Sequence, residues 1–308
     1  MKVLVLGSKG QLGRCLSNQF YNTDYELIYT SRQEIDIADL KATKVEIADI
    51  DPSVVINASA YTAVDKAEED EQAADLINHR AVANIANTCI ELGCWLIHVS
   101  TDYVFDGTAS RPYREIDITN PQSVYGKSKL NGEYAIQASG CKHLIIRTAW
   151  VFSEYGNNFM INMLRLGADR DELSIVGDQV GCPTYAQDIA NAIVSMLPSL
   201  DSKTLASGIF HYCGDQPCSW YEFAQVIFSE AKTAGLKTPS RVKAIGTAEY
   251  PTPAIRPAYS VLECSKINNT FNISPSNWRH GIKCVLAEAH KQRYGTSENH
   301  NLLHEKIK

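Results

Sequence analysis

The chain has 308 residues, of which 44% are hydrophobic and 21% charged, and its formal net charge is -6. This composition is typical of a soluble globular protein that can bury a sizeable core. Acidic and basic residues are interspersed, so we expect no nucleic acid as a partner. The apolar runs are too short to cross a bilayer and no signal peptide is recognisable, so we expect no membrane association. The nine cysteines form no CxxC pair, which favours a reducing compartment, the cytoplasm.

The first half of the chain alternates short apolar runs with longer helical patterns. Strands are predicted at residues 2–7, 25–31, 53–59, 94–101 and 142–150, and helices at 11–21, 40–51, 72–93 and 128–139. This alternation predicts an α/β fold, a Rossmann-type doubly wound parallel sheet with helices on both faces. Ligands of such a sheet bind at the carboxyl ends of its strands.

The pattern becomes irregular beyond about residue 150, where most of the 11 prolines lie. We therefore expect an NAD(P)-binding Rossmann domain at residues 1–150 and a smaller, mainly substrate-binding lobe at residues 151–308. A helical pattern near residues 185–198 is expected to return to the first domain.

A glycine-rich turn, GSKGQLG, follows the first predicted strand and precedes a helix. Gly7, Gly10 and Gly13 remove the side chains that would keep a diphosphate from the backbone, and the helix N-terminus faces the anion. The spacing G-x-x-G-x-x-G differs from the common G-x-G-x-x-G. Its place after the first strand still predicts a dinucleotide site.

The end of the second strand is expected to contact the adenosine ribose. Ser31 and Arg32 stand where an acidic residue would bind the 2′-hydroxyl of NAD, which favours NADPH. NADH remains a second possible cofactor. Asp36 and Ile37 follow and are candidates to line the adenine, and the small residues of 57–62 suit backbone running under a dinucleotide.

A threonine, a tyrosine and a lysine suit the reduction of a ketone. Thr101 ends a buried strand, and Tyr125 and Lys129 lie four residues apart, on one face of a predicted helix. A free tyrosine has a pKa of about 10 and is a weak acid at neutral pH. We expect the Lys129 cation to lower that pKa, Tyr125 to deliver the proton, and Thr101 to hold the carbonyl oxygen.

Seven segments carry a resemblance to a known family. They are GSKGQLG, VINASAYTAVDKAE, HVSTDYVFDG, VYGKSKLNGE, IRTAWVFSEYGNNF, DQVGCPT and YPTPAIRP. With them the chain resembles the extended short-chain dehydrogenases/reductases and, within these, the dTDP-4-dehydrorhamnose reductase family. The resemblance implies NADPH-dependent reduction of the C4 ketone of dTDP-4-dehydro-L-rhamnose, in the biosynthesis of nucleotide sugars for cell-surface polysaccharides.

The resemblance also implies a role for each matching position. The catalytic residues would be Thr101, Tyr125 and Lys129, and Lys129 would also hold the nicotinamide ribose. The cofactor contacts would be Gly7, Gly10, Gln11, Leu12, Gly13, Ala58, Ala60 and Thr62, and the substrate contacts Asp102, Tyr103, Trp150, Asn157, Asn158 and Arg256. A guanidinium such as that of Arg256 suits a diphosphate through paired hydrogen bonds.

One departure from the family concerns a metal. Some members form a dimer around a magnesium ion held by glutamates, but here Cys15 and Gln187 replace two of them and only Glu288 remains. Magnesium prefers hard oxygen ligands. We therefore expect no metal, and a monomer or weak homodimer.

Three alternatives remain open at this point. A related sugar-nucleotide enzyme of the same fold, such as a 4,6-dehydratase or an epimerase, is the nearest; the dehydratase is disfavoured because Tyr103 follows Asp102 where such enzymes usually have a glutamate. A reductase that gives 6-deoxy-L-talose differs only in facial selectivity. A non-catalytic regulator, similar to the beta subunit of methionine adenosyltransferase, shares much of this pattern.

Overall fold

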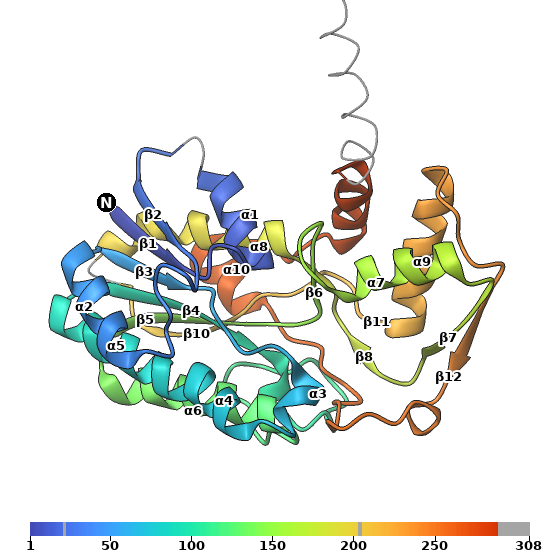
Figure 1. Cartoon of the computed structure of the whole chain (residues 1–308), viewed down its shortest axis with the longest axis horizontal. Coiled ribbons are helices and arrows are strands. Elements are labelled where there is room, and N and C mark those ends of the chain that lie inside the picture. Colours follow the sequence, from blue (N-terminus) through green and yellow to red (C-terminus); the bar gives the residue numbers. More distant parts are fainter. Residues whose placement is uncertain (21–22, 203–204, 289–308) are drawn as a thin grey trace, which may run out of the picture.

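A six-stranded parallel sheet forms the centre of the larger part of the molecule (Figure 1). The computed structural model describes residues 1–20, 23–202 and 205–288. The strands of the sheet are β1 (Lys2–Leu6), β2 (Glu26–Thr30), β3 (Val54–Asn57), β4 (Trp95–Thr101), β5 (Lys142–Thr148) and β10 (Gly208–His211). Their order is β10-β5-β4-β3-β1-β2, and every neighbouring pair is parallel.

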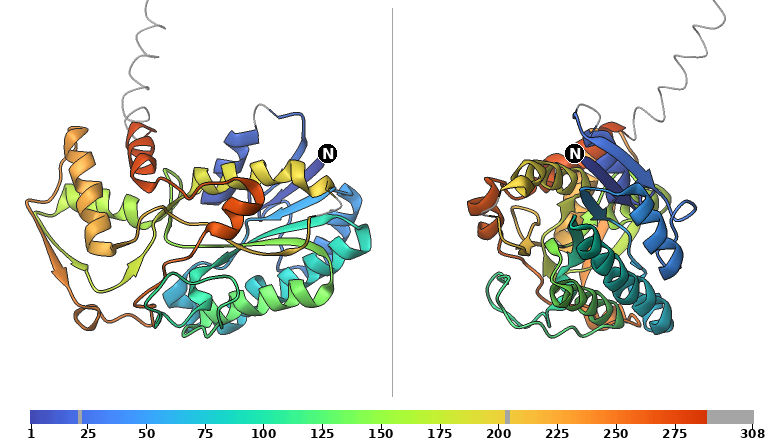
Figure 2. Two further views of the ribbon diagram at one scale, coloured as in Figure 1. Left: turned by 180° about the vertical axis from the view of Figure 1, so that it is seen from behind. Right: turned by 90° about the vertical axis from the view of Figure 1, so that its left-hand side faces the viewer.

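Both faces of this sheet are buried, because successive side chains of a strand point to opposite faces. Val3 and Val5 pack with α1 (Gln11–Gln19) and α8 (Ala186–Met196) on one face. Leu4 and Leu6 pack with α2 (Leu40–Ile50), α5 (Ala81–Leu92) and α6 (Val124–Ser139) on the other face. The views in Figure 2 show these two helix layers from behind and from the side. The predicted doubly wound α/β fold is confirmed.

The predicted helix at residues 72–93 is interrupted by a π-helical turn. The segment consists of α4 (Glu71–Asp75), the π turn Leu76–Arg80 and α5. A Cβ on Gly132 of α6 would come within 2.2 Å of the carbonyl oxygen of Asn78, in the middle of that turn. Glycine therefore lets α6 pack directly against the π turn, which fixes the position of α6 over the sheet.

The start of α6 is set by a capping side chain. The Oγ of Ser123 accepts a hydrogen bond from the backbone N–H of Gly126 at 3.1 Å, as expected of an N-cap serine. The helix ends at Gly140, whose φ is 74°. Tyr125 and Lys129 consequently occupy the first two turns of α6, directly beside the end of β4.

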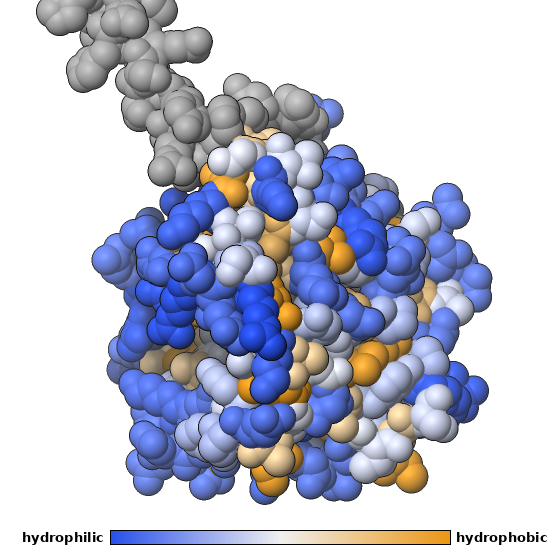
Figure 3. Space-filling model, turned by 90° about the vertical axis from the view of Figure 1, so that its right-hand side faces the viewer, coloured by the Kyte–Doolittle hydropathy of each residue, from blue (hydrophilic) through white to orange (hydrophobic). Residues whose placement is uncertain are grey.

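A smaller lobe lies beside the carboxyl ends of the sheet strands, on the right in Figure 1. Its elements are β6 (Val151–Phe152), α7 (Phe159–Asp169), β7 (Glu172–Val176), β8 (Val180–Gly181), β9 (Thr184–Tyr185), β11 (Cys218–Ser219), α9 (Trp220–Thr233) and β12 (Arg241–Ile245). A helix that begins at residue 278 packs on the same core, which includes Phe223, Ile227 and Trp278. Hydrophilic side chains cover most of the face of this lobe shown in Figure 3, with hydrophobic ones interspersed.

Two later segments of the chain lie with the sheet rather than with the smaller lobe. Helix α8 packs along α1, and β10 pairs with β5. Strand β10 was not predicted from the sequence. The predicted domain boundary at residue 150 stays a prediction, because it assigns cofactor binding and substrate binding to the two parts of the chain as well as describing how they pack. Within the described residues no helix has the length and apolarity needed to span a membrane.

Candidate active site

The glycine turn lies where the strand order reverses, between β1 and β3, which is the expected ligand position of such a sheet. Gly7 has a φ of 85°, a conformation that favours glycine. A Cβ on Gly13 would lie 2.3 Å from the carbonyl oxygen of Gly7, so only glycine allows α1 to pack so close to the turn. Gly10 is the N-cap of α1 and makes no side-chain capping bond. The first N–H groups of α1 are therefore oriented to bind an anion. Gln11 and Leu12 open that helix, and Leu12 packs in the core.

The turn is attached to the end of β2. The carbonyl oxygen of Thr30 accepts hydrogen bonds from the N–H groups of Gly7 and Ser8 at 2.9 and 3.0 Å. This brings Ser31 and Arg32 beside the diphosphate turn. Ser31 is buried, whereas the Arg32 side chain is 82% exposed and contacts Asp36 at 3.1 Å.

The two residues predicted to line the adenine, Asp36 and Ile37, lie in different environments. Asp36 is partly exposed beside Arg32, while Ile37 is 5% exposed and packs in the core below the sheet. Lys9, which the sequence analysis did not single out, donates to the side-chain oxygen of Gln33 at 2.6 Å. A second cation therefore lies near Arg32.

The segment after β3 runs past the glycine turn. Ala58 donates its N–H to the carbonyl of Leu6, and a Cβ on Gly7 would meet Ser59 N at 2.9 Å. Ala60 is partly exposed and Thr62 exposed. The small side chains of this segment therefore border the predicted cofactor site.

Thr101 and Tyr125 meet at the carboxyl end of β4. Thr101 is 5% exposed, and its Oγ1 donates to Oδ1 of Asp102 at 3.0 Å and accepts from the N–H of Tyr103 at 3.2 Å. Burial raises the pKa of Tyr125 to about 12, and a hydrogen bond with Thr101 opposes that rise. Its ring packs edge-on against Tyr103, with centroids 5.5 Å apart. The phenol is thus fully protonated at neutral pH.

Lys129 lies beside this pair but contacts other groups. Its Nζ donates to the carbonyl of Val99 at 2.7 Å and lies 3.2 Å from Nε2 of His98. Lys129 is 1% exposed, and burial lowers its pKa to about 8. Burial of the phenol dominates the shift of the Tyr125 pKa, and Lys129 is not among its causes, so the expected lowering of that pKa by the Lys129 cation stays a prediction.

A buried ion pair supports this region of α6. Arg147 of β5 donates two hydrogen bonds to the Glu133 carboxylate, with Nη2 2.6 Å from Oε2, and Ser100 donates to the same carboxylate. Glu133 is 0% exposed. The pair joins α6 to β5, and Ser100 joins it to β4 beside Thr101.

Asp102 is a buried carboxyl with one unpartnered oxygen. It is 2% exposed, and burial raises its pKa to about 6. Its Oδ2 has no hydrogen-bond partner in the described structure. Tyr103, which follows it, has its pKa raised by burial. Both side chains border Tyr125, and their contact with a sugar stays a prediction.

Trp150 stands between the sheet and the smaller lobe in an unusual backbone conformation. Its φ is 47°, and its indole stacks on that of Trp220, with centroids 3.4 Å apart. A Cβ on Gly181 would lie 2.5 Å from this indole. The sequence analysis missed Trp220, whose position becomes clear only from the fold.

The last three predicted substrate contacts are placed differently from one another. Asn157 is exposed. Asn158 is buried, caps α7 by accepting from the N–H of Ile161 at 3.1 Å, and donates to the side chain of Gln11 at 3.0 Å. Arg256 makes a bidentate ion pair with Asp65, at 3.0 and 2.7 Å. Asn158 and Arg256 thus join the two lobes, and their predicted contact with substrate is untested.

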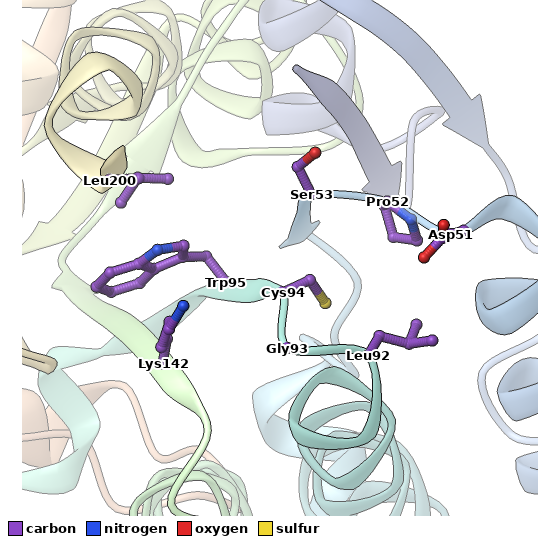
Figure 4. Close-up of a pocket in the computed structure, with 9 residues that line it drawn as sticks. All are labelled: Asp51, Pro52, Ser53, Leu92, Gly93, Cys94, Trp95, Lys142 and Leu200. Carbon is purple, nitrogen blue, oxygen red and sulfur yellow. The ribbon is translucent and has the colours of Figure 1, made fainter. Parts of the chain in front are cut away.

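The described residues contain no group of three or more histidine, cysteine or acidic side chains that could hold a metal ion. Cys15 is buried in the core, and Gln187 donates to the side chain of Asn191 at 3.1 Å. A pocket of 440 Å³ lies at the opposite edge of the sheet, at the start of β3, β4 and β5 (Figure 4). It is lined by Asp51, Pro52, Ser53, Leu92, Gly93, Cys94, Trp95, Lys142 and Leu200, and it is therefore separate from Thr101 and Tyr125.

Fold and site together define an extended short-chain dehydrogenase/reductase, with a dinucleotide turn on β1 and a Thr-Tyr-Lys set on β4 and α6. The family model of the RmlD substrate binding domain matches residues 1–291. The chain belongs to this family.

Named relatives cover nearly the whole chain. The dTDP-4-dehydrorhamnose reductase of Aggregatibacter actinomycetemcomitans is 43% identical over 94% of this chain and 99% of its own length. The crystal structure of the Clostridium acetobutylicum dTDP-4-dehydrorhamnose reductase superposes with a TM-score of 0.88 at 39% identity, over 94% of this chain and 100% of that one. The Bacillus anthracis reductase in complex with NADP has a TM-score of 0.85 at 34% identity, over 93% and 99% of the two chains.

Proposed function

We propose that this protein catalyses the NADPH-dependent reduction of the C4 ketone of dTDP-4-dehydro-L-rhamnose to dTDP-L-rhamnose. The observation that carries the proposal is the meeting of Thr101 and Tyr125 at the end of β4, beside Lys129 and on the same carboxyl edge of the sheet as the glycine turn of β1. The family match and the named relatives support the same substrate. The product would enter nucleotide-sugar and polysaccharide biosynthesis, in the cytoplasm.

The residues present fit a dinucleotide. A Cβ on Gly13 would collide with the turn and one on Gly7 with Ser59, so glycine keeps the turn close against the N-terminus of α1, which is free of side-chain caps. Gly10, Gln11 and the segment 58–62 would hold the diphosphate and the nicotinamide half. Arg32 and the neighbouring Ser31 would bind the 2′-phosphate of NADPH. The Arg32 side chain is exposed, so it can leave its contact with Asp36 to reach that phosphate. When bound, NADPH supplies the hydride.

Tyr125 would donate the proton that completes the reduction. Its phenol keeps its proton at neutral pH, because burial raises its pKa to about 12. The alkoxide that develops at C4 is a far stronger base than a phenolate, so proton transfer to it is favourable. Thr101 would hold the same oxygen through its hydroxyl, and Lys129 would stabilise the phenolate as it forms, while also holding the nicotinamide ribose.

The substrate would lie between the sheet and the smaller lobe. Asp102 and Tyr103 would contact the sugar, Trp150 would border it, and Asn157 and Arg256 would reach the nucleotide part. Asn158, whose bonds are already used, would act by joining α7 to Gln11. We assign residues 1–150, together with α8 and β10, to cofactor binding and most of residues 151–308 to the substrate.

The proposal is tested by incubating the protein with NADPH and dTDP-4-dehydro-L-rhamnose and identifying the sugar by NMR. Oxidation of NADPH with formation of dTDP-L-rhamnose is the expected result. Formation of the 6-deoxy-L-talose isomer would contradict the proposed facial selectivity. Tight NADPH binding without oxidation would contradict the proposed activity and favour a regulatory protein.

A further inference from the structure

Three buried side chains form a series of polar contacts that ends on the amine of Lys129. Asn57, at the end of β3, and His98, in β4, are 1% and 0% exposed. Nδ2 of Asn57 lies 3.2 Å from Nδ1 of His98, and Nε2 of His98 lies 3.2 Å from Nζ of Lys129. The register of the sheet pairs Asn57 directly with His98, so their side chains share the face that α6 covers.

The backbone fixes which end of the Asn57 amide faces His98. The N–H of Ser59 only donates, and it lies 3.0 Å from the side-chain oxygen of Asn57. The NH2 group of Asn57 therefore faces Nδ1 of His98. Since that group also only donates, Nδ1 must accept, and the single proton of the neutral imidazole lies on Nε2. Burial and the charge of Lys129 lower the pKa of His98 well below its ordinary value, which agrees with a neutral ring.

The same reasoning then applies to Lys129. An ammonium group has three N–H donors and no lone pair, so it would face the Nε2–H of His98 as a second donor at 3.2 Å. A neutral amine instead accepts that hydrogen through its lone pair and still donates to Val99 at 2.7 Å. The direction of the series therefore weakens the ammonium form of Lys129, whose pKa of about 8 still leaves it mostly protonated at neutral pH.

We propose that Asn57 and His98 are positioning residues that turn the Nε2–H of His98 toward the Lys129 amine and so weaken the hold of that amine on its proton. The inference rests on the proposed reductase function, in which Lys129 assists Tyr125. A lysine fixed as an ammonium by a carboxylate would hold its charge but would not release its proton. Asn57 supplies no charge, and this distinguishes the series from an ordinary ion pair.

Other charged groups near Lys129 are already engaged. Glu133, one turn later on α6, raises the pKa of Lys129, but Arg147 and Ser100 bind its carboxylate. Asp102 directly follows β4, and Tyr125 lies one turn before Lys129 on α6. These groups surround the amine from α6, β4 and β5, and His98 is the one that contacts it.

The tautomer of His98 is the first test, because it does not depend on activity. In the full chain labelled with 15N-histidine, and with the His98 signals assigned through His98→Gln, NMR is expected to show the proton on Nε2 and no titration between about pH 5 and 9. A proton on Nδ1, or a ring that titrates in this range, would overturn the inference.

Asn57→Asp is the second test, because it reverses the direction of the series. The new carboxylate still accepts the hydrogen bond from the N–H of Ser59, but it can no longer donate to His98. The His98 proton is therefore expected on Nδ1, where it bonds the carboxylate, and Nε2 then accepts a hydrogen bond from the Lys129 ammonium. The pH at which kcat declines on the alkaline side is expected to rise by about one unit or more. If this alkaline limb of the pH profile of kcat is unchanged, the inference is contradicted.

Asn78→Asp is the matched control. Asn78 is also 1% exposed and lies against α6, but it bonds Tyr61 and Ser128 and has no contact with His98. An equal shift of the alkaline limb in this variant would mean that any buried carboxylate suffices, and would overturn the inference. Wild-type protein without reductase activity would count against the proposed function alone, and the His98 tautomer would then decide the inference. If Asn57→Asp does not fold, the same wild-type tautomer decides it.

Discussion

Tyr125 is the residue on which the proposed proton transfer depends. Tyr125→Phe removes the hydroxyl and keeps the ring contact with Tyr103. Turnover is expected to fall by about 10²- to 10⁴-fold, the usual contribution of a general acid, while NADPH affinity stays close to that of the wild type. Steady-state kinetics and cofactor titration measure the two effects. Tyr134→Phe, an exposed tyrosine of the same helix, is the control and should leave turnover unchanged.

Arg32 is the residue that we expect to distinguish the two nicotinamide cofactors. Its side chain is 82% exposed and makes one contact, with Asp36, so removing it should cost little stability. Arg32→Ala is expected to raise the KM for NADPH at least about tenfold and to change that for NADH little. Arg241→Ala, an exposed arginine of the smaller lobe, is the control. If the preference for NADPH is kept in Arg32→Ala, the 2′-phosphate is recognised elsewhere, with Lys9 the nearest candidate.

Residue patterns predicted which candidate side chains come together better than they predicted the contacts of each one. Thr101 and Tyr125 were expected together, because both lie at the carboxyl edge of a parallel sheet. The partners of Lys129 were missed, because His98 stands within an apolar strand and Asn57 at the end of another. Their contact arises from the pairing of β3 with β4, which is long-range in sequence. Asp65, the partner of Arg256, was missed for the same reason.

At the scale of elements, the packing of α1 on the glycine turn depends on Gly13. Gly13→Ala would place its Cβ 2.3 Å from the Gly7 carbonyl and 2.6 Å from Cα of Ser8, so the helix or the turn must move. We expect the free energy of unfolding to fall by about 1–3 kcal/mol and NADPH affinity to fall with it. Denaturant unfolding and cofactor titration check this. Gly208→Ala in β10, where the added Cβ meets nothing closer than 3.5 Å, should change neither; an equal loss there would contradict the steric argument.

The junction of α6 with β5 depends on the Glu133–Arg147 pair. Glu133→Gln keeps the shape of the side chain but leaves the buried Arg147 charge without its counter-charge. Removing one partner of a buried pair typically costs about 3–5 kcal/mol, which we expect in the free energy of unfolding. Glu172→Gln, in the exposed pair with Arg241, is the control and should cost less than about 1 kcal/mol. Losses of similar size in the two variants would refute the claim that burial makes the difference.

Elements of regular pattern were predictable, and short or tightly packed ones were not. The five strands expected in the first half are the long apolar runs that a doubly buried parallel sheet requires. Strand β10 has four residues, Gly208–His211, and such a short run gives no clear pattern. The π turn was hidden because its residues continue the helical periodicity, and the residue that packs against it, Gly132, lies on another helix.

At the scale of the whole molecule, a few polar contacts connect the sheet with the smaller lobe. Gln11, at the glycine turn, accepts hydrogen bonds from Ser153 and Asn158 of the smaller lobe. Asp65, in the segment after β3, binds Arg256 of the same lobe. The stacked pair of Trp150 and Trp220 stands between them. Thr101 and Tyr125 thus lie where the two parts meet, which is where the proposed nucleotide sugar would contact both.

The central claim is that this chain transfers a hydride from NADPH to C4 of dTDP-4-dehydro-L-rhamnose. The most direct test uses NADPH dideuterated at C4 of the nicotinamide and locates the label in the product by NMR and mass spectrometry. We expect one deuterium per molecule, at C4 of dTDP-L-rhamnose, and none from deuterated solvent at that carbon. Deuterium at another carbon, or a product without label, would contradict the claim.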